Sequence, residues 1–166
     1  VLARIAQQMC QVLGATSAYI CSFDDDTFYS TVLAEYVGES ATASERESDL
    51  GTVYYMPEQF PRDLQLIKVG WPTTIHGDDE DLNAHEQQHL QKHGVKSLLV
   101  LPMQFGGRTV AYAEVWESRR RREFSPDEVA LGQAIAQQAS IAFENARLFQ
   151  SVEHERTRLN ALIQAS

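Results

Sequence analysis

The stretch of residues 95–117 has the sequence VKSLLVLPMQFGGRTVAYAEVWE. Two apolar runs, 95–105 and 108–117, are separated in it by the pair Gly106-Gly107. A two-residue Gly-Gly link between such runs is a strong β-hairpin signal, because both glycines accept the positive φ angles of a tight turn. The stretch therefore predicts two antiparallel strands.

The pattern within each run indicates which faces of these strands are covered. Residues 98–101 are all apolar and show no alternation, so this strand is expected to be buried on both faces of the sheet. In the second run, alternation places Tyr112, Glu114 and Trp116 on one face. The sheet is therefore expected to have a layer of structure on each side.

The chain before this hairpin supplies further helices and strands. Leu2, Ile5 and Met9 recur at helical spacing, and Gly14 follows where the helix is expected to end. Residues 38–49 have few side chains to bury and predict a loop. The other predicted elements are strands at 17–23, 28–37 and 52–56, a short helix within 57–69, and a helix at 83–93 closed by Gly94.

The last third of the chain predicts one long helix. Ser125 is suited to cap its N-terminus, Pro126 to occupy its first position, and Asp127 and Glu128 to interact with its dipole. Beyond the sheet, a stripe at alternating steps of three and four residues resembles a coiled-coil seam. We call it the output stripe; its members are Ala142, Asn145, Phe149, Val152, Arg156, Leu159 and Ile163. A single projecting helix cannot bury such a stripe, so a parallel homodimer is expected.

Composition narrows the possible partners. The 166 residues suit one domain, and the formal net charge of -9 disfavours binding to nucleic acid or to anionic membranes. The two cysteines, Cys10 and Cys21, form no C-x-x-C pair, which argues against a disulfide scaffold and suits a reducing cytoplasm. No apolar run is long enough to span a membrane. Because helix begins at once after Val1, we expect the chain to be part of a longer protein.

Two stretches resemble the GAF family. The run GVKSLLVLP at 94–102, followed after the Gly-Gly turn by VAYAEV at 110–115, is similar to the family's paired central strands. The run FSPDEV at 124–129, leading to ASIAFENARL at 139–148, resembles the helix by which bacterial GAF domains continue into a histidine kinase or cyclase. The resemblance covers nearly the whole chain and is weakest at 38–81. It implies an α/β (α+β) fold with a GAF/PAS-like central antiparallel sheet of five to six strands. Terminal helices would cover one face, and short helices and loops would close a pocket on the other.

The resemblance also allows three ligand classes of the family to be checked. Cyclic-nucleotide binders share an Asn-Lys pair after the last strand, but Glu117-Ser118 stands there, although Phe124, Asp127 and Glu128 loosely match. Bilin-binding members carry a cysteine in the pocket-side loop or helix, whereas Cys10 falls in the first helix and Cys21 in the first strand. The same cysteine positions count against methionine-sulfoxide reduction. We therefore expect no cofactor, with an unknown small-molecule ligand as a possibility.

The pocket candidates come from alternation and from aromatic content. They are Tyr19, Cys21, Tyr36, Tyr55, Trp71, Tyr112, Glu114 and Trp116, with Tyr54 as a further aromatic residue. These aromatic residues could equally be ordinary core. A buried carboxylate at Glu114 needs a partner, because an isolated buried charge is costly. Hydrogen bonds from Tyr19 or Trp116, or a cationic ligand, would supply one. The alternative that we favour places Glu114 at the edge of the sheet or beside an arginine.

Other polar residues have plainer explanations. His85, His89 and His93 share one helical face and could chelate a metal, but their polar neighbours favour a solvated surface helix and no metal site. We expect His76 to be an exposed loop residue rather than a haem ligand. The run of four arginines at 119–122 could bind a phosphate, but a solvated turn is the more common explanation.

These observations combine into one functional hypothesis. No nucleophile can be paired with a base, so we expect no enzyme. Residues 1–143 are expected to form a GAF domain and 144–166 a signalling helix. The predicted function is a cytoplasmic, homodimeric sensor domain of a signal-transduction protein, a histidine kinase by resemblance, with an effector domain C-terminal to it and no contact with nucleic acid or membrane. The alternatives are a ligand-free dimerisation spacer and a thiol-based redox module that uses Cys21.

Overall fold

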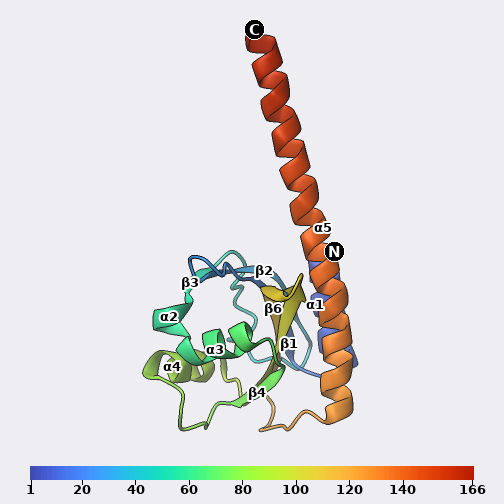
Figure 1. Cartoon of the computed structure of the whole chain (residues 1–166). Coiled ribbons are helices and arrows are strands. Elements are labelled where there is room, and N and C mark those ends of the chain that lie inside the picture. The colour runs from blue at the N-terminus through green and yellow to red at the C-terminus, as the bar shows by residue number, and fades with distance from the viewer.

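A computed structural model describes residues 1–166, which form one six-stranded antiparallel sheet with helices on both faces (Figure 1). The strands are β1 Ser17–Ser22, β2 Tyr29–Val37, β3 Val53–Tyr55, β4 Thr73–His76, β5 Ser97–Phe105 and β6 Arg108–Glu117. The helices are α1 Leu2–Val12, α2 Met56–Gln59, α3 Pro61–Val69, α4 Ala84–His93 and α5 Pro126–Ala165. The order across the sheet is β3-β2-β1-β6-β5-β4, and the predicted fold class is confirmed.

The β5–β6 hairpin forms as its sequence predicts. Gly106 and Gly107 have φ angles of 62° and 79°, a conformation that residues with a Cβ rarely adopt. Along β5 the side chains alternate between two separate cores, with Leu99 on one side of the sheet and Leu98 on the other. The prediction that this strand is buried on both faces is therefore confirmed.

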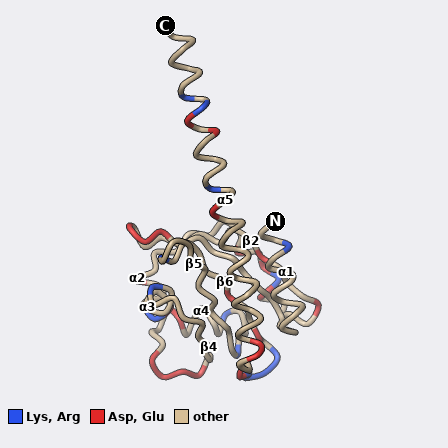
Figure 2. Tube along the Cα trace, turned by 45° about the vertical axis from the view of Figure 1, so that its right-hand side comes forward, with Lys and Arg blue, Asp and Glu red and all other residues tan.

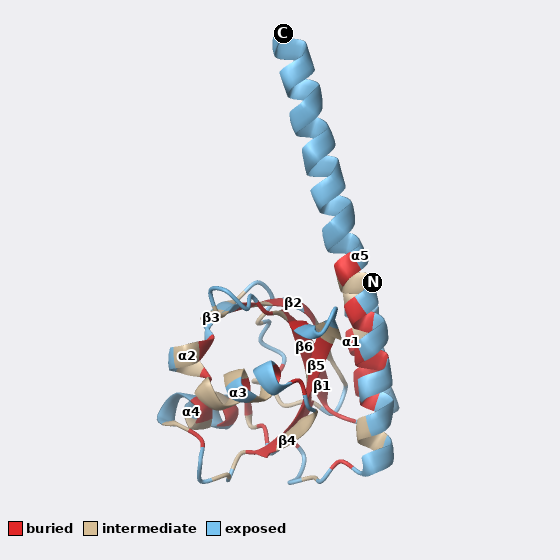
Figure 3. Ribbon diagram, in the orientation of Figure 1, coloured by how far each residue is buried: buried red, intermediate tan, exposed pale blue.

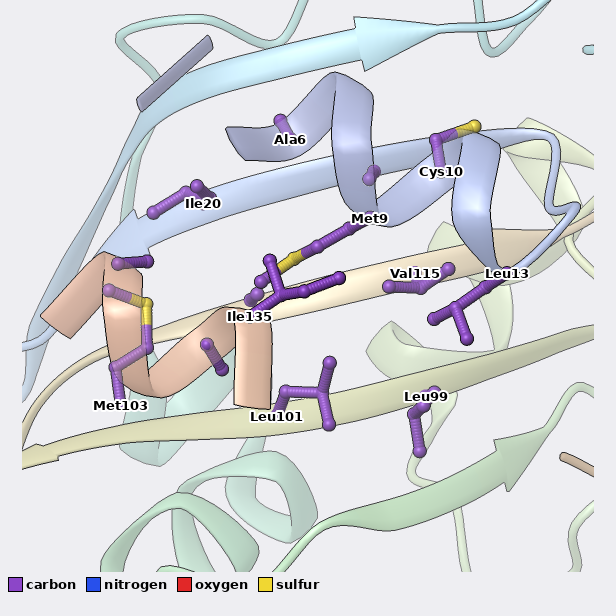
Figure 4. Close-up of a cluster of buried hydrophobic side chains, with 14 of the residues drawn as sticks. Ala6, Met9, Cys10, Leu13, Ile20, Leu99, Leu101, Met103, Val115 and Ile135 are labelled. Carbon is purple, nitrogen blue, oxygen red and sulfur yellow. The ribbon is translucent and has the colours of Figure 1, made fainter. Parts of the chain in front are cut away.

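The first core lies between the sheet and the two terminal helices (Figure 4). Met9 of α1, Leu13 just past the end of that helix, and Ile135 of α5 pack against Leu101 of β5. The approach of α5 is close at Gly132, where an added Cβ would lie 3.1 Å from the Leu101 Cδ1 atom. The absence of a side chain at this position lets α5 lie on the sheet and the end of α1 together.

The second core lies on the opposite face, under α2, α3 and α4. Met56, Phe60 and Ile67 come from the segment predicted as one short helix, and Leu90 comes from α4. That segment is two helices, because Pro61 begins α3 and Phe60 before it has a non-helical φ of -138°. This layer closes over the face that carries the side chains of Tyr112 and Trp116.

Helix α5 is continuous and leaves the globular part of the molecule. Ser125 and Glu128 form a capping box at its start, as the Ser-Pro-Asp-Glu sequence predicts. Glu144 is its last buried residue, and every residue from Asn145 onward is exposed (Figure 3). The output stripe therefore projects without a partner within this chain, while the division of the chain at residue 143 stays a prediction.

One connecting segment differs from the sequence-based expectation, whereas the segment at 38–49 is a loop, as predicted. The segment after Trp71 contains β4, which pairs with β5 from Thr73↔Val100 to His76↔Ser97. Four residues with two threonines carry too weak a pattern to be recognised without their partner strand. The loop at 38–49 is fastened at its centre, because Glu45 is buried and the Thr42 hydroxyl donates to the His93 carbonyl at 3.0 Å.

The arginine run is not a simple solvated turn. Most charged segments, the arginine run among them, lie in loops and at helix ends (Figure 2). Next to this run, however, Glu117 at the end of β6 is fully buried. Arg119 and Arg122 both bind its carboxylate, at 2.9 and 3.2 Å, and Arg121 pairs with Asp78. The buried carboxylate requires these cations, so the run is structural, and Arg120 alone of the four makes no hydrogen bond or ion pair.

No helix of the chain combines the length and the apolar character that crossing a membrane requires.

Candidate functional site

A small cavity lies inside the second core, between the sheet and helices α3 and α4. Its volume is about 40 Å³, which is room for a few water molecules or a ligand of a few atoms. Sixteen residues line it, eleven of them hydrophobic. An apolar pocket with a few polar groups directed into it is the usual form of a small-molecule site.

Five of the eight predicted pocket residues line this cavity. They are Tyr19, Cys21, Tyr112, Glu114 and Trp116. Strands β1 and β6 are neighbours with the register Tyr19↔Glu114 and Cys21↔Tyr112, so alternation in each strand directs these side chains to one face. Whether they contact a ligand stays a prediction.

The other three predicted pocket residues lie elsewhere, which corrects the prediction. Tyr36 packs on the first core, on the opposite face of the sheet, and its hydroxyl accepts from Gln11 at 3.3 Å. Tyr55 is exposed, and its ring lies 5.1 Å from that of Tyr29. Trp71 is 73% exposed. The face of a short or irregular segment is set by its partner strand, and neither Tyr55 nor Trp71 had a partner that the sequence revealed.

Several lining residues were not singled out as site residues from the sequence. Asp63 of α3 follows Phe60 by three residues and precedes Ile67 by four, so it lies on the apolar face of that helix. Glu86 of α4 similarly precedes the buried Leu90 by four. An acidic residue at helical spacing from two core residues was the available signal. Tyr54, noted only as an aromatic, lines the cavity in place of Tyr55.

Glu114 lies at the centre of the sheet, which corrects the interpretation that we favoured. Strand β6 pairs with β1 on one side and β5 on the other, so Glu114 is not at an edge. It forms no ion pair with an arginine, and its Oε2 accepts a hydrogen bond from Trp116 Nε1 at 3.0 Å. Burial raises the pKa of the Glu114 carboxyl to about 7, although the bond from Trp116 acts in the opposite direction.

The carboxyl of Glu114 shares the cavity with three other acidic residues, Asp49, Asp63 and Glu86. Burial raises the pKa of Asp63 well above its usual range, and the charges of Glu114 and Glu86 raise it further. Burial also raises the pKa of Glu86. One oxygen of Glu86 receives only a 3.4 Å bond from the Arg62 backbone N–H, and the other has no hydrogen-bond partner. The cavity therefore concentrates acidic groups that the protein leaves incompletely paired.

The three histidines of α4 pack on aromatic rings rather than lying along a solvated face. His89 lies 5.1 Å from the Phe60 ring and 5.9 Å from that of Trp116, and His93 lies 5.4 Å from Trp116. Only His85 is exposed. Burial lowers the pKa of His89 to about 4, so its ring is neutral at pH 7. The helix is amphipathic, with His89 and His93 facing inward and His85 exposed, and the many glutamines around them hid this pattern in the sequence.

His76 is also not the exposed loop residue that was expected. It is buried on β4, with its Nδ1 atom 2.7 Å from the Ser97 hydroxyl and its Nε2 atom 2.8 Å from a Glu123 carboxylate oxygen. Because β4 is a short strand with little sequence signal, the burial of His76 followed only from its pairing with β5. It does not line the cavity.

The two cysteines lie on opposite faces of the sheet. Cys10 belongs to the first core and Cys21 to the second. Burial raises the pKa of the Cys21 thiol well above its ordinary value. A reactive thiol needs a low pKa and access to solvent, so the redox alternative lacks both of its requirements.

Comparison with known proteins agrees with this architecture. The family model described as "GAF domain" matches residues 1–143. The chain belongs to the GAF domain family. No curated protein matches the chain.

Solved structures share the fold of this GAF domain at low sequence identity. One is the blue-light absorbing form of the Thermosynechococcus elongatus PixJ GAF domain, with a TM-score of 0.71, 15% identity, and coverage of 92% of this chain and 88% of that one. Another is the domain of a putative two-component sensor histidine kinase protein from Sinorhizobium meliloti 1021, with a TM-score of 0.68, 16% identity, and coverage of 92% and 94%. At this identity the likeness concerns the fold.

A third structure corrects the expectation that no cofactor is involved. It is a phycoerythrobilin-bound GAF domain from a cyanobacterial phytochrome, with a TM-score of 0.71, 20% identity, and coverage of 89% of this chain and 86% of that one. Domains of this architecture thus include one with a bound chromophore. The positions of two cysteines in the sequence were too narrow a basis for the expectation.

The raised pKa of Glu114 predicts a characteristic pH dependence of stability for this GAF domain. The folded carboxyl holds its proton up to about pH 7 and the unfolded one only to about 4.5. The stabilising effect of the bound proton is therefore complete below pH 4.5 and is lost as the pH rises through 7. The resulting change in the free energy of unfolding is about 3 kcal/mol, because each pKa unit corresponds to about 1.36 kcal/mol.

Glu114→Gln isolates this effect, because glutamine retains an acceptor for Trp116 and does not titrate. Urea unfolding of both proteins at pH 5 and pH 8 gives the difference between their unfolding free energies. We expect the wild type to lose about 2.5 kcal/mol relative to the variant between these pH values. A difference that does not change with pH would contradict the burial of an ionisable Glu114.

Proposed function

We propose that this GAF domain is a sensory module that binds a small ligand in the cavity and transmits occupancy to α5. The observation that carries the proposal is the alternation along β5. Leu98 lines the cavity, while the adjacent Leu99 and Leu101 pack in the core that holds α1 and α5. A displacement of this one strand therefore changes the contacts of both layers.

The coupling needs two arrangements of α5 that differ in their affinity for the ligand. A ligand shifts an equilibrium only by its differential affinity for the two states. Gly132 places α5 against Leu101, so the position of the helix depends on the position of the strand beneath it. Interdigitated cores transmit such shifts because they are close-packed.

We further propose that the output is carried by a parallel homodimer formed through the output stripe. Phe149, Val152, Leu159 and Ile163 are exposed along one side of α5. One helix cannot bury this stripe, whereas two such helices bury it in a coiled coil. An effector domain following α5, such as a histidine kinase, would then receive a change in helix packing. The module itself performs no catalysis in this proposal.

A chromophore of bilin size does not fit the cavity in this structure. The volume of about 40 Å³ holds only a few atoms. The Cys21 thiol, which lies in the cavity wall, is enclosed and has a raised pKa, and Cys10 is on the other face of the sheet. These residues support a smaller ligand, and no step of the proposal uses a bilin.

Native mass spectrometry of the full chain tests the proposal. We expect a dimer that carries additional mass. Val32→Phe should remove that mass, because Val32 lines the cavity and a larger ring would fill it, whereas Leu33→Phe should retain it, since Leu33 is exposed. By reciprocity of linkage, Val32→Phe should also change the dimer dissociation constant several-fold.

The alternative function, a ligand-free dimerisation spacer, predicts a different result. A spacer would give a dimer without additional mass, and its dissociation constant would be the same for Val32→Phe and Leu33→Phe. That outcome would refute ligand sensing while leaving dimerisation intact.

A further inference from the structure

The charges around the cavity are of one sign. Asp49, Asp63, Glu86 and Glu114 all line it, and none of them forms an ion pair. The cation that comes nearest is Arg62, whose guanidinium is directed instead to Asp79 and Asp81, at 3.0 and 2.6 Å. The acidic cavity thus lacks the positive partner that buried carboxylates normally have.

Two of these carboxyls have oxygens that accept no hydrogen bond. Glu86 is 2% exposed, and its Oε2 atom is buried without any partner. Asp63 is 7% exposed, and its carboxyl accepts no hydrogen bond. Buried polar groups are nearly always satisfied in native proteins, so the unpaired Oε2 atom of Glu86, a residue of the cavity wall, points to a ligand that donates to it.

The remaining wall of the cavity is aromatic. The rings of Tyr19 and Trp116 lie 4.3 Å apart, and Tyr54 packs edge-on against Phe60 at 5.2 Å. All four line the cavity. The faces of such rings carry partial negative charge and attract cations, most strongly at Trp. Aromatic rings and carboxylates therefore favour the same kind of ligand.

We propose that the cavity binds a small primary ammonium ion, with its N–H groups donating to Asp63 and Glu86 and its alkyl part against Trp116 and Tyr19. This inference rests on the proposed function, since it names the ligand class of the same cavity. A primary ammonium has three donors and no acceptor, which matches a site that offers carboxylates. The cavity volume of about 40 Å³ limits the ligand to a few heavy atoms.

The protonation of these carboxyls agrees with this assignment. Burial and the charges of Glu114 and Glu86 raise the pKa of Asp63, and burial raises that of Glu114, so the cavity wall by itself disfavours their charged forms. A bound ammonium ion neutralises both effects. A metal ion fits less well, because no three of the chain's His, Cys, Asp and Glu side chains are placed to hold one.

Trp116 offers a direct reporter for the test. The chain has two tryptophans, and Trp71 is exposed and lies outside the cavity. The variant Trp71→Phe therefore has Trp116 as its only tryptophan, so its tryptophan emission reports on the cavity. The full chain carrying this change is titrated with ethylammonium chloride at constant ionic strength. We expect a saturable change in Trp116 emission that KCl and ethanol do not produce.

The matched variants locate the binding. Asp63→Asn and Glu86→Gln should each weaken binding about tenfold or more, because each removes a charge-assisted hydrogen bond. Glu80→Gln removes an equal charge at an exposed position outside the cavity and should have no effect. Circular dichroism checks that each variant is folded. Should one carboxyl variant fail to fold, the other one gives the same comparison.

The outcomes separate this inference from the proposed function. A response that ethanol reproduces, that persists in Asp63→Asn and Glu86→Gln, or that never saturates would overturn ammonium binding. If ethylammonium fails while native mass spectrometry finds a different molecule lost in Val32→Phe, sensing stands and only the ligand class is wrong. Tighter binding of tetramethylammonium than of ethylammonium would also overturn it, since that ion donates no hydrogen bond.

Discussion

Replacing Arg122 by methionine is expected to lower the free energy of unfolding by about 3 kcal/mol. The side chain of Arg122 is only 9% exposed, and it binds the fully buried Glu117 at 3.2 Å. Removing one partner of a buried pair leaves an uncompensated charge, which costs about 3–5 kcal/mol. Arg119 remains to bind Glu117 at 2.9 Å, so we place the loss at the lower end of that range.

Arg122 also joins three elements whose ends meet at this point. Its guanidinium donates to the Leu13 carbonyl at 2.6 Å and the Gly14 carbonyl at 3.2 Å, just past the end of α1. It binds Glu128 in the first turn of α5 and lies 4.6 Å from the centre of the Phe124 ring. Methionine replaces part of the apolar stem but none of these bonds.

Arg120→Met is the matched control, because Arg120 is exposed and makes no hydrogen bond or ion pair. We expect it to change the free energy of unfolding by less than about 0.5 kcal/mol. Urea unfolding of the three proteins at pH 7 gives the comparison. Equal, small losses in both variants would show that the run is a solvated turn after all.

The sequence was sufficient for the elements that carry a complete local signal. The β5–β6 hairpin follows from Gly106-Gly107, and the burial of β5 on both faces follows from four consecutive apolar residues. The start of α5 follows from the Ser125 capping box. In each case the deciding residues are neighbours in sequence, so no tertiary partner is needed to recognise them.

The sequence was insufficient where a distant partner decides the outcome. Strand β4 exists because β5 pairs with it, and that pairing buries His76. Tyr36 and Tyr55 were assigned to the pocket as aromatics, whereas their strand registers direct them elsewhere. Register between segments far apart in the chain is set by tertiary packing, which local pattern does not contain.

The residues of the candidate site likewise fall into those that the sequence indicated and those that it did not. Tyr112, Glu114 and Trp116 line the cavity as a group because they alternate along one strand, a pattern that the sequence contains. Asp63 and Glu86 come from helices whose orientation over the sheet is fixed only in the folded protein. The acidic character of the cavity therefore emerges when three elements converge.

Placing two carboxylates in the output stripe is expected to dissociate the proposed homodimer. Val152 and Leu159 are seven residues apart, exposed, and equivalent in the stripe's repeat. In a parallel dimer each would face its counterpart, so Val152→Glu/Leu159→Glu brings four like charges into an apolar seam. We expect the dissociation constant to rise at least about a hundredfold, because buried unpaired charges are strongly unfavourable.

The matched control places the same charges on the opposite side of the same helix. His154 and Ala161 are also seven residues apart and exposed, but they lie two positions beyond the stripe residues in the repeat and face away from the seam. His154→Glu/Ala161→Glu should leave the dimer intact in sedimentation equilibrium, although the helix gains the same two carboxylates. Dissociation by both pairs would indicate general charge repulsion, and dissociation by neither would mean that the dimer, if it forms, uses another surface. Only selective loss at Val152 and Leu159 supports the transmission of a signal through a paired α5, since a helix without a partner has no second packing arrangement to adopt.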